Sequence, residues 1–152
     1  MKTCSSADGV VVAAVRPRSP AATGGLAAGD HLLSINGQPL RDAIDVQFHA
    51  SDEVLEVEVA RAETRRRVRI VRRTGDLGLE LEAPRPGEIA TCANACVLCF
   101  IHQLPRGMRK SLYVKDDDLR LSFLHGNYIT LSDLDEASFE RIIEQRLSPL
   151  YI

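Results

Sequence analysis

The clearest pattern in the chain is a strict alternation of apolar and charged residues in two neighbouring segments. Residues 55–59 alternate apolar side chains with glutamates, and residues 67–70 alternate arginines with apolar side chains. A period of two places the apolar residues on one face of a β-strand. If Ala60 pairs with Arg65 around a four-residue loop, the apolar faces and the charged faces of the two strands both match. The alternation therefore predicts an antiparallel hairpin with the pairs Leu55–Ile70, Glu56–Arg69, Val57–Val68 and Glu58–Arg67.

Shorter signals in the first half of the chain predict further strands and two short helices. The β-branched run at residues 9–15 predicts a buried strand, and residues 32–35 predict another. Residues 19–22 begin with Ser-Pro and residues 42–49 begin with an aspartate, which is typical of helix starts. The Asn-Gly pair at residues 36–37 predicts a tight hairpin turn.

The second half of the chain is patterned like alternating strands and helices. Residues 88–91 predict a strand that leads into a cysteine-rich loop, and residues 121–124, continuing through 128–131, predict a second strand. Residues 150–152 resemble the start of a third. A helix capped by Ser132 separates the last two, and its apolar stripe comprises Leu134, Ala137, Phe139, Ile143 and Leu147. Strands separated by helices favour a parallel α/β arrangement.

The segment at residues 83–87 marks a boundary between these two patterns. Its sequence, Ala-Pro-Arg-Pro-Gly, combines two prolines and a glycine directly after a predicted strand. Such a combination is typical of a linker. We therefore expect a first domain at residues 1–82, a linker at 83–87 and a second domain at 88–152.

Composition and charge narrow the classes of function. The chain has 152 residues, of which 45% are hydrophobic and 26% charged, as in an ordinary globular protein. Its net charge of −2 gives no field that would attract nucleic acid or an anionic membrane. The arginines from Arg61 to Arg73 face glutamates in the predicted hairpin, which favours a solvated strand face over a nucleic-acid surface. The N-terminus carries no export signal, so we expect a reducing, cytoplasmic location.

Three of the four cysteines, Cys92, Cys96 and Cys99, fall within eight residues at the spacing C-x3-C-x2-C. Clustered thiolates select soft metals, chiefly zinc or iron–sulfur clusters. Three cysteines suffice for three irons of a 4Fe–4S cluster and leave the fourth iron open. Alternatively, His102 completes a Cys3His zinc site, the usual number of ligands for structural zinc. Cys4 stands alone, and we interpret it as incidental.

The cysteine loop resembles the cluster loop of radical S-adenosylmethionine (radical SAM) enzymes. That family has an aromatic residue directly before the third cysteine, whereas this chain has Leu98 there and Phe100 directly after the cysteine. Residues 100–109, 113–123 and 126–131 resemble an uncharacterised bacterial family in which a PDZ domain precedes a radical SAM domain. This resemblance implies the N-terminal part of a longer protein of the α+β class. A small β-rich PDZ-like domain would precede the first strand–helix units of an incomplete radical SAM (β/α) barrel.

The same resemblance implies a set of functional residues. Cys92, Cys96 and Cys99 would bind a 4Fe–4S cluster whose open iron binds S-adenosyl-L-methionine. Phe100 would lie near the adenine, and Gly126 with Asn127 would bind the methionyl amino group. The full-length protein would be an oxidoreductase that acts on an unknown substrate and is reduced by an electron donor protein. This piece alone would not turn over substrate. We interpret the acidic run at residues 115–118 as a solvated loop without a catalytic role.

Residues 19–22, 25–26, 29–30 and 35–37 resemble the pattern of bacterial PDZ domains, which accept a peptide as an added strand. Leu77, Gly78 and Leu79 are the candidates for the loop that binds the peptide carboxylate, in a circularly permuted order. The alternative is that residues 77–79 form only the last strand and that the domain packs against its own catalytic partner. A second overall function also stays open: a non-enzymatic PDZ peptide-binding module with a Cys3His zinc-stabilised segment.

Overall fold

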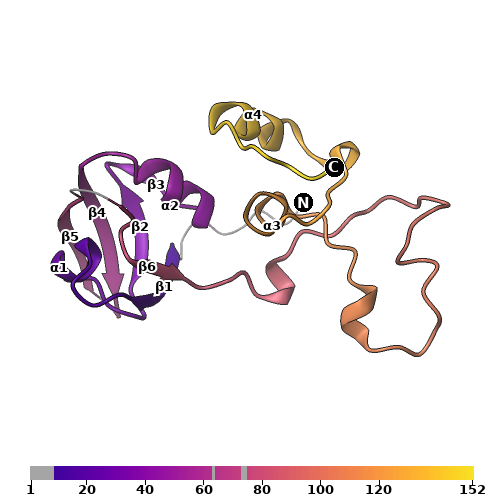
Figure 1. The fold of residues 1–152 in the computed structure, drawn as a ribbon, viewed down its shortest axis with the longest axis horizontal. Helices are drawn as coiled ribbons and strands as arrows, with labels where there is room; N and C mark the ends of the chain where they lie inside the picture. The colour runs from indigo at the N-terminus through magenta and orange to yellow at the C-terminus, as the bar shows by residue number, and fades with distance from the viewer. Residues whose placement is uncertain (1–8, 63, 73–74) are drawn as a thin grey trace. The chain divides into compact units, whose positions relative to one another are not determined.

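The computed structural model describes residues 9–62, 64–72 and 75–152, so Cys4 lies outside the described residues. The chain divides into two compact units, the first ending at Ala83 and the second beginning at Pro84 (Figure 1). Among the helices of the described ranges, none is long and apolar enough to cross a membrane.

The first unit is built around one antiparallel sheet. The strands follow the spatial order β5-β4-β2-β1-β6, and the short β3 pairs with β2. Two short helices, α1 (Pro20–Thr23) and α2 (Ala43–His49), belong to the same unit. The strands are β1 (Val10–Val15), β2 (His31–Ile35), β3 (Gln38–Pro39), β4 (Val54–Arg61), β5 (Thr64–Val71) and β6 (Leu79–Leu81).

The predicted hairpin is strands β4 and β5, and its register is confirmed. Ala60 lies opposite Arg65, and all four predicted cross-strand pairs are present. The pairing extends one step further than expected, because Arg61 also lies opposite Thr64. The inward-facing apolar side chains of this hairpin lie in a core with residues of β1 and β2. The buried members of the core on these strands are Val10, Val12, Leu32, Ile35, Leu55, Val57, Val59 and Ile70.

The predicted helix starts and the turn of the first unit are also confirmed. The Ser19 hydroxyl accepts a hydrogen bond from the backbone N–H of Ala22 at 3.2 Å. The Asp42 carboxylate likewise accepts from two N–H groups in the first turn of α2. Asn36 and Gly37 both have positive φ, which suits a two-residue hairpin turn. Each cap satisfies backbone donors that the helix itself leaves without partners.

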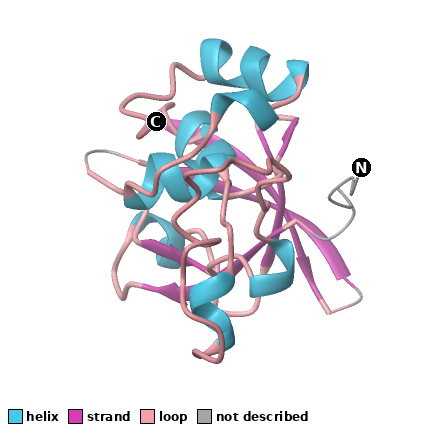
Figure 2. Cartoon of the chain, turned by 90° about the vertical axis from the view of Figure 1, so that its right-hand side faces the viewer, coloured by secondary structure: helices cyan, strands magenta, loops and turns pink. Residues whose placement is uncertain are grey.

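The second unit contains two α-helices, α3 (Leu119–His125) and α4 (Glu136–Glu144), and three short 3₁₀ turns (Figure 2). The turns are η1 (Pro86–Glu88), η2 (Lys110–Tyr113) and η3 (Leu131–Asp133). In this unit, all of which the structure describes, strand pairing consists of two isolated bridges. One joins Thr91 to Asp116 and the other joins Tyr128 to Tyr151 in parallel. The α+β class is confirmed, whereas the strands predicted at residues 88–91, 121–124, 128–131 and 150–152 are wrong beyond these bridges.

Residues 121–124 are helical because α3 has a capping residue at its N-terminus and a glycine that ends it at its C-terminus. The Asp118 carboxylate accepts a hydrogen bond from the N–H of Arg120 at 2.9 Å and caps the N-terminus. Gly126 ends the helix in the left-handed conformation. Similarly, α4 is capped by Asp135, whereas the predicted cap, Ser132, lies within η3. The predicted inward stripe of α4 is wrong at Ala137, Phe139 and Ile143, all of which are exposed, Ile143 by 76%.

Candidate metal centre

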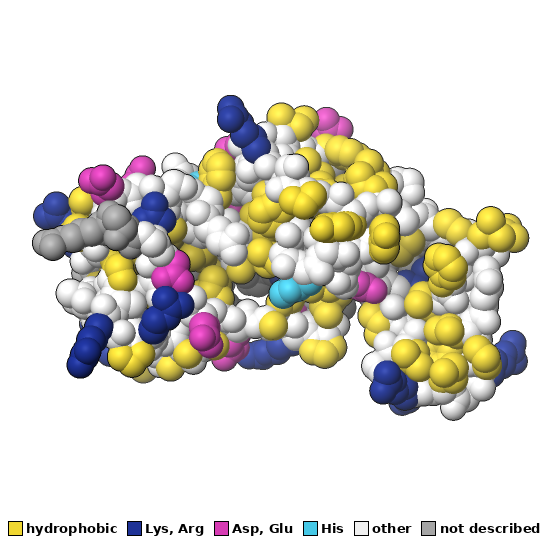
Figure 3. All heavy atoms as spheres, in the orientation of Figure 1, with side chains coloured by type: hydrophobic (Ala, Val, Ile, Leu, Met, Phe, Trp, Pro, Cys, Tyr) yellow, Lys and Arg dark blue, Asp and Glu magenta, His cyan; other side chains and the backbone are white. Residues whose placement is uncertain are grey.

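The three clustered cysteines lie on a long irregular loop of the second unit. All three are free thiols, with Cys92 and Cys99 half-buried and Cys96 exposed. The N–H of Cys99 donates to the carbonyl of Cys96 at 3.2 Å, so the last two cysteines share one turn. Hydrophobic side chains gather on the surface at the right of Figure 3, and the loop exposes Val97, Leu98 and Phe100.

Cys92 is held more firmly than the other two cysteines. Its N–H donates to the carbonyl of Lys115 at 2.8 Å, and the N–H of Asp117 donates to the carbonyl of Ala90 at 2.8 Å. The bridge between Thr91 and Asp116 lies between these two bonds. A short antiparallel contact therefore fixes the start of the cysteine loop, while Cys96 and Cys99 lie further along it.

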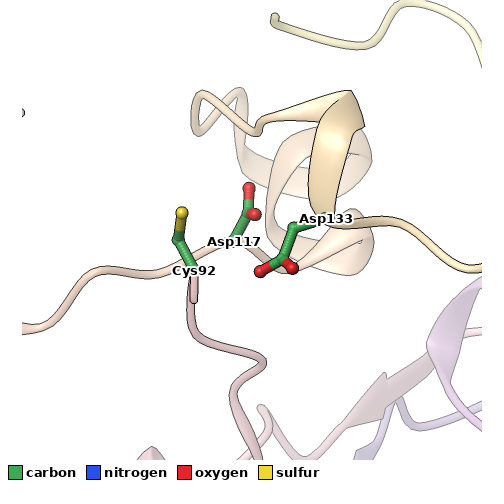
Figure 4. A group of neighbouring side chains, drawn as sticks. All are labelled: Cys92, Asp117 and Asp133. Carbon is green, nitrogen blue, oxygen red and sulfur yellow. The ribbon is translucent and has the colours of Figure 1, made fainter. Parts of the chain in front are cut away.

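The Cys92 sulfur lies beside two carboxylates. One potential ligand atom from each of Cys92, Asp117 and Asp133 forms a group in which all atoms lie within 4.8 Å of one another (Figure 4). The Thr130 hydroxyl is 3.8 Å from the same sulfur. Cys96 and Cys99 are not members of this group. The structure thus brings the first predicted ligand together with Asp117, which the sequence placed in a solvated loop, and with Thr130 and Asp133, to which the sequence assigned no role in this site.

The acidic run at residues 115–118 is not a solvated loop, and that interpretation is wrong. Asp117 and Asp118 are buried. Lys115 Nζ donates to the carbonyl of Asn94 at 2.6 Å, inside the cysteine loop. The run therefore connects the cysteine loop to the rest of the second unit. One sequence signal could have indicated a structural role for residues 115–118. They lie within the segment 113–123, which is part of the family resemblance.

Each of the three consecutive acids in this run binds a different partner. Asp116 accepts from Asn127 Nδ2 at 2.7 Å. Asp117 accepts from both the N–H and the hydroxyl of Thr130, at 2.6 and 2.7 Å. Asp118 accepts from the N–H of Ala90 and the guanidinium of Arg120. Burial by itself would raise the pKa of Asp118, but these hydrogen bonds outweigh it and hold the pKa below its usual value.

The residues predicted to contact S-adenosylmethionine lie in two different settings. Phe100 is 85% exposed on the cysteine loop. Gly126 ends α3, and the adjacent Asn127 is oriented by its bond to Asp116. His102, the fourth ligand of the alternative zinc site, is exposed and does not belong to the Cys92 group. These roles stay predictions.

The candidate peptide-binding loop of the first unit connects β5 to β6. Leu77 is buried in the core, and its carbonyl accepts from the N–H of Ala21 at 3.1 Å. Gly78 has a φ of +72°, and its carbonyl accepts from the N–H of Arg16 at 2.8 Å. Leu79 begins β6, which lies at one edge of the sheet. The loop is thus anchored directly before an edge strand, and its peptide-binding role stays a prediction.

Comparisons with known proteins match both units. The family model described as a Radical SAM-like domain matches residues 72–152, and the PDZ domain model matches residues 11–61. An alignment 106 positions long, which covers 65% of this chain, is 35% identical to the magnetosome formation protease MamE of Paramagnetospirillum magneticum. The match spans 13% of that protein's length.

Two solved PDZ domains resemble part of the chain. The HtrA3 PDZ domain bound to a phage-derived ligand is 29% identical, with a TM-score of 0.40. That match covers 49% of this chain and 66% of the HtrA3 chain. The PDZ domain of an SdrC-like protein from Listeria monocytogenes is 24% identical, with a TM-score of 0.41. It is matched over 87% of its length and 49% of this chain.

Proposed function

The chain belongs to the family of Radical SAM-like domains and carries a PDZ domain before that region, and from this premise we propose that it is the N-terminal part of a radical SAM oxidoreductase. The observation that carries the proposal is the group of three free thiols on one loop inside the matched region. Cys92, Cys96 and Cys99 would hold a 4Fe–4S cluster. When bound, the cluster would supply the electron that cleaves S-adenosyl-L-methionine.

The donor set fits this cluster. Thiolates are the ligands that iron–sulfur clusters use, and three of them leave one iron open for a cofactor. All three cysteines are unpaired, so no disulfide has to be broken before metal binds. Cys92 would provide the fixed ligand, because its backbone is bound to Lys115. The loop beyond it contains turns but no α-helix or strand, so it can adjust to bring in Cys96 and Cys99.

The other residues of the second unit would bind and orient the cofactor. The Asn127 amide is held by Asp116 and lies next to Gly126, so a polar group and a glycine backbone are available for the methionyl amino group. Phe100 offers an exposed aromatic face for the adenine. The substrate is unknown, and the electron would come from a donor protein. Free thiols suit a reducing, cytoplasmic location.

The PDZ domain would bind an extended segment, either a free peptide or another part of the same protein. The support is that β6 lies at the sheet edge and follows the candidate loop at Leu77, Gly78 and Leu79. An edge strand has backbone groups that can pair with an added strand. Titration of the full chain with a library of C-terminal peptides tests this role. Retained affinity after the terminal carboxylate is amidated would contradict carboxylate binding by this loop.

Reconstitution with iron and sulfide under oxygen-free conditions tests the cluster. We expect a brown chain with about four irons, whose paramagnetic signal after reduction shifts when S-adenosylmethionine is added. Cys96→Ala should reduce the iron content and absorbance, whereas the matched Cys4→Ala variant should retain both. A colourless chain with one tightly held zinc would refute the cluster. That result would favour the alternative, a non-enzymatic PDZ module with a zinc-stabilised segment.

A further inference from the structure

The proposed cluster leaves the two carboxylates beside Cys92 without a role. Cys92 Sγ and one oxygen from each of Asp117 and Asp133 lie within 4.8 Å of one another. The three side chains come from separate segments of the second unit and lie side by side in Figure 4. Any metal centre bound through the Cys92 sulfur would therefore have two carboxyl groups close to one of its ligands.

Both carboxylates are held in place by hydrogen bonds. Asp117 is only 6% exposed and accepts two hydrogen bonds from Thr130. Asp133 accepts a hydrogen bond at 2.7 Å from the N–H of Ala93, the residue that follows Cys92. The hydrogen bond from Ala93 ties the Asp133 carboxylate directly to the backbone of the cysteine loop. The charges would consequently stay near the sulfur when the loop closes around a cluster.

No cation neutralises these two acids among the residues that the structure describes. The ion pair described in the second unit joins Asp118 to Arg120 and involves neither Asp117 nor Asp133. Within the described second unit, the ammonium group of Lys115 donates to the Asn94 carbonyl and forms no ion pair with either aspartate. The hydrogen bonds to Asp117 and Asp133 come from neutral donors. The two side chains therefore place carboxylates beside Cys92 without a basic partner, and the buried Asp117 is less screened by water than the exposed Asp133.

We propose that Asp117 and Asp133 lower the reduction potential of the iron–sulfur cluster through their charge beside Cys92, an inference that rests on the proposed function. Reduction adds one electron from an external donor to the cluster and makes it one unit more negative. A fixed negative charge opposes that change, and net charge near a cluster is one determinant of its potential. The two acids are thus positioning and tuning residues that act through Cys92 and do not themselves bind iron.

A redox titration monitored by electron paramagnetic resonance tests this inference on the reconstituted full chain. The reductant is dithionite, and the variants are Asp117→Asn and Asp133→Asn. Asparagine keeps the shape and can still accept the backbone hydrogen bond through its amide oxygen. The exposed Glu140→Gln on α4 removes the same charge at a residue outside the Cys92 group. It therefore controls for net charge.

We expect Asp117→Asn to raise the reduced-to-oxidised ratio at a fixed potential at least tenfold, which corresponds to about 59 mV for one electron. Asp133→Asn should give a smaller rise in the same direction because water screens it, and Glu140→Gln should give none. An unchanged or lowered potential in both aspartate variants, with the cluster fully loaded, would overturn this inference and leave the proposed function standing. If Asp117→Asn cannot hold the cluster, the potential of the Asp133→Asn variant tests the inference by itself, and an unchanged or lowered value would overturn it. A wild-type chain that takes up no iron would refute the proposed function and this inference together.

Discussion

The substitution Gly78→Ala tests how the candidate peptide loop is anchored in the PDZ domain. Gly78 has a φ of +72°, a conformation that favours glycine. A Cβ added there would lie 2.3 Å from the Cβ of Ser19 and 2.7 Å from its hydroxyl. Ser19 is the N-cap of α1, so the new methyl group would displace a capping residue as well as strain the backbone.

Gly75→Ala provides a matched control because Gly75 has a φ of +83° with open space around the added Cβ. A left-handed backbone costs a non-glycine residue about 1–2 kcal/mol, and this applies to both variants. Overpacking adds about 1–3 kcal/mol and loss of a serine cap about 1 kcal/mol, and these apply only at Gly78. Gly78→Ala should therefore lower the free energy of unfolding by about 2–4 kcal/mol more than Gly75→Ala.

Urea unfolding of the full chain, followed by far-ultraviolet circular dichroism, measures this difference. The β-rich domain should unfold at lower urea in Gly78→Ala, and peptide affinity should fall with it if the loop forms the binding site. Equal destabilisation by the two variants would refute the reasoning, because it would mean that Ser19 does not occupy the space beside Gly78. A lower urea midpoint with unchanged peptide affinity would support the packing of Gly78 against Ser19. It would also show that Leu77, Gly78 and Leu79 do not form the peptide-binding site.

Three further predictions concern stability. Leu55→Ala should lower the free energy of urea unfolding by about 2–5 kcal/mol because Leu55 is 0% exposed. The control Val71→Ala, at an exposed position, should lower it much less. Equal losses in the two variants would contradict the assigned core. Asp42→Ala removes the cap of α2 and should cost about 1 kcal/mol by the same assay, with an unchanged midpoint as the contrary result. Because the folded-state pKa of Asp118 lies below its unfolded value of about 3.9, its contribution is present above that pH and is lost as the pH falls through the folded pKa. The melting temperature of Asp118→Asn should therefore fall less steeply below about pH 4 than that of the wild type. The same pH dependence in both proteins would show that the pairing of Asp118 with Arg120 contributes nothing to stability.

Local patterns were sufficient for most of the first domain. The alternation in residues 55–59 and 67–70 determined the hairpin and its register, because a slip by one residue would expose every apolar side chain. The caps of α1 and α2 were readable because a polar side chain satisfies backbone donors within a few residues of itself. Such signals act over one turn and need no tertiary context.

The same reasoning failed in the second unit, where apolar runs are short. Residues 121–124 suit either a strand or a helix, and the result depended on Asp118 at one end and Gly126 at the other. The expected pairing between strands was reduced to single bridges. A parallel sheet needs neighbouring strands and cover on both faces, which no local pattern supplies.

The candidate site divides in the same way between sequence and structure. The spacing of Cys92, Cys96 and Cys99 predicts three soft ligands on one loop, and their joint binding of a metal stays a prediction because Cys96 and Cys99 do not belong to the group around Cys92. That Asp117 and Asp133 lie beside the first sulfur was decided only by the tertiary structure. These residues are far apart in the chain, and hydrogen bonds to Thr130 and Ala93 bring their carboxylates together. The sequence thus predicted which sulfur atoms would bind a metal, and the fold decided which carboxylates lie beside the first of them.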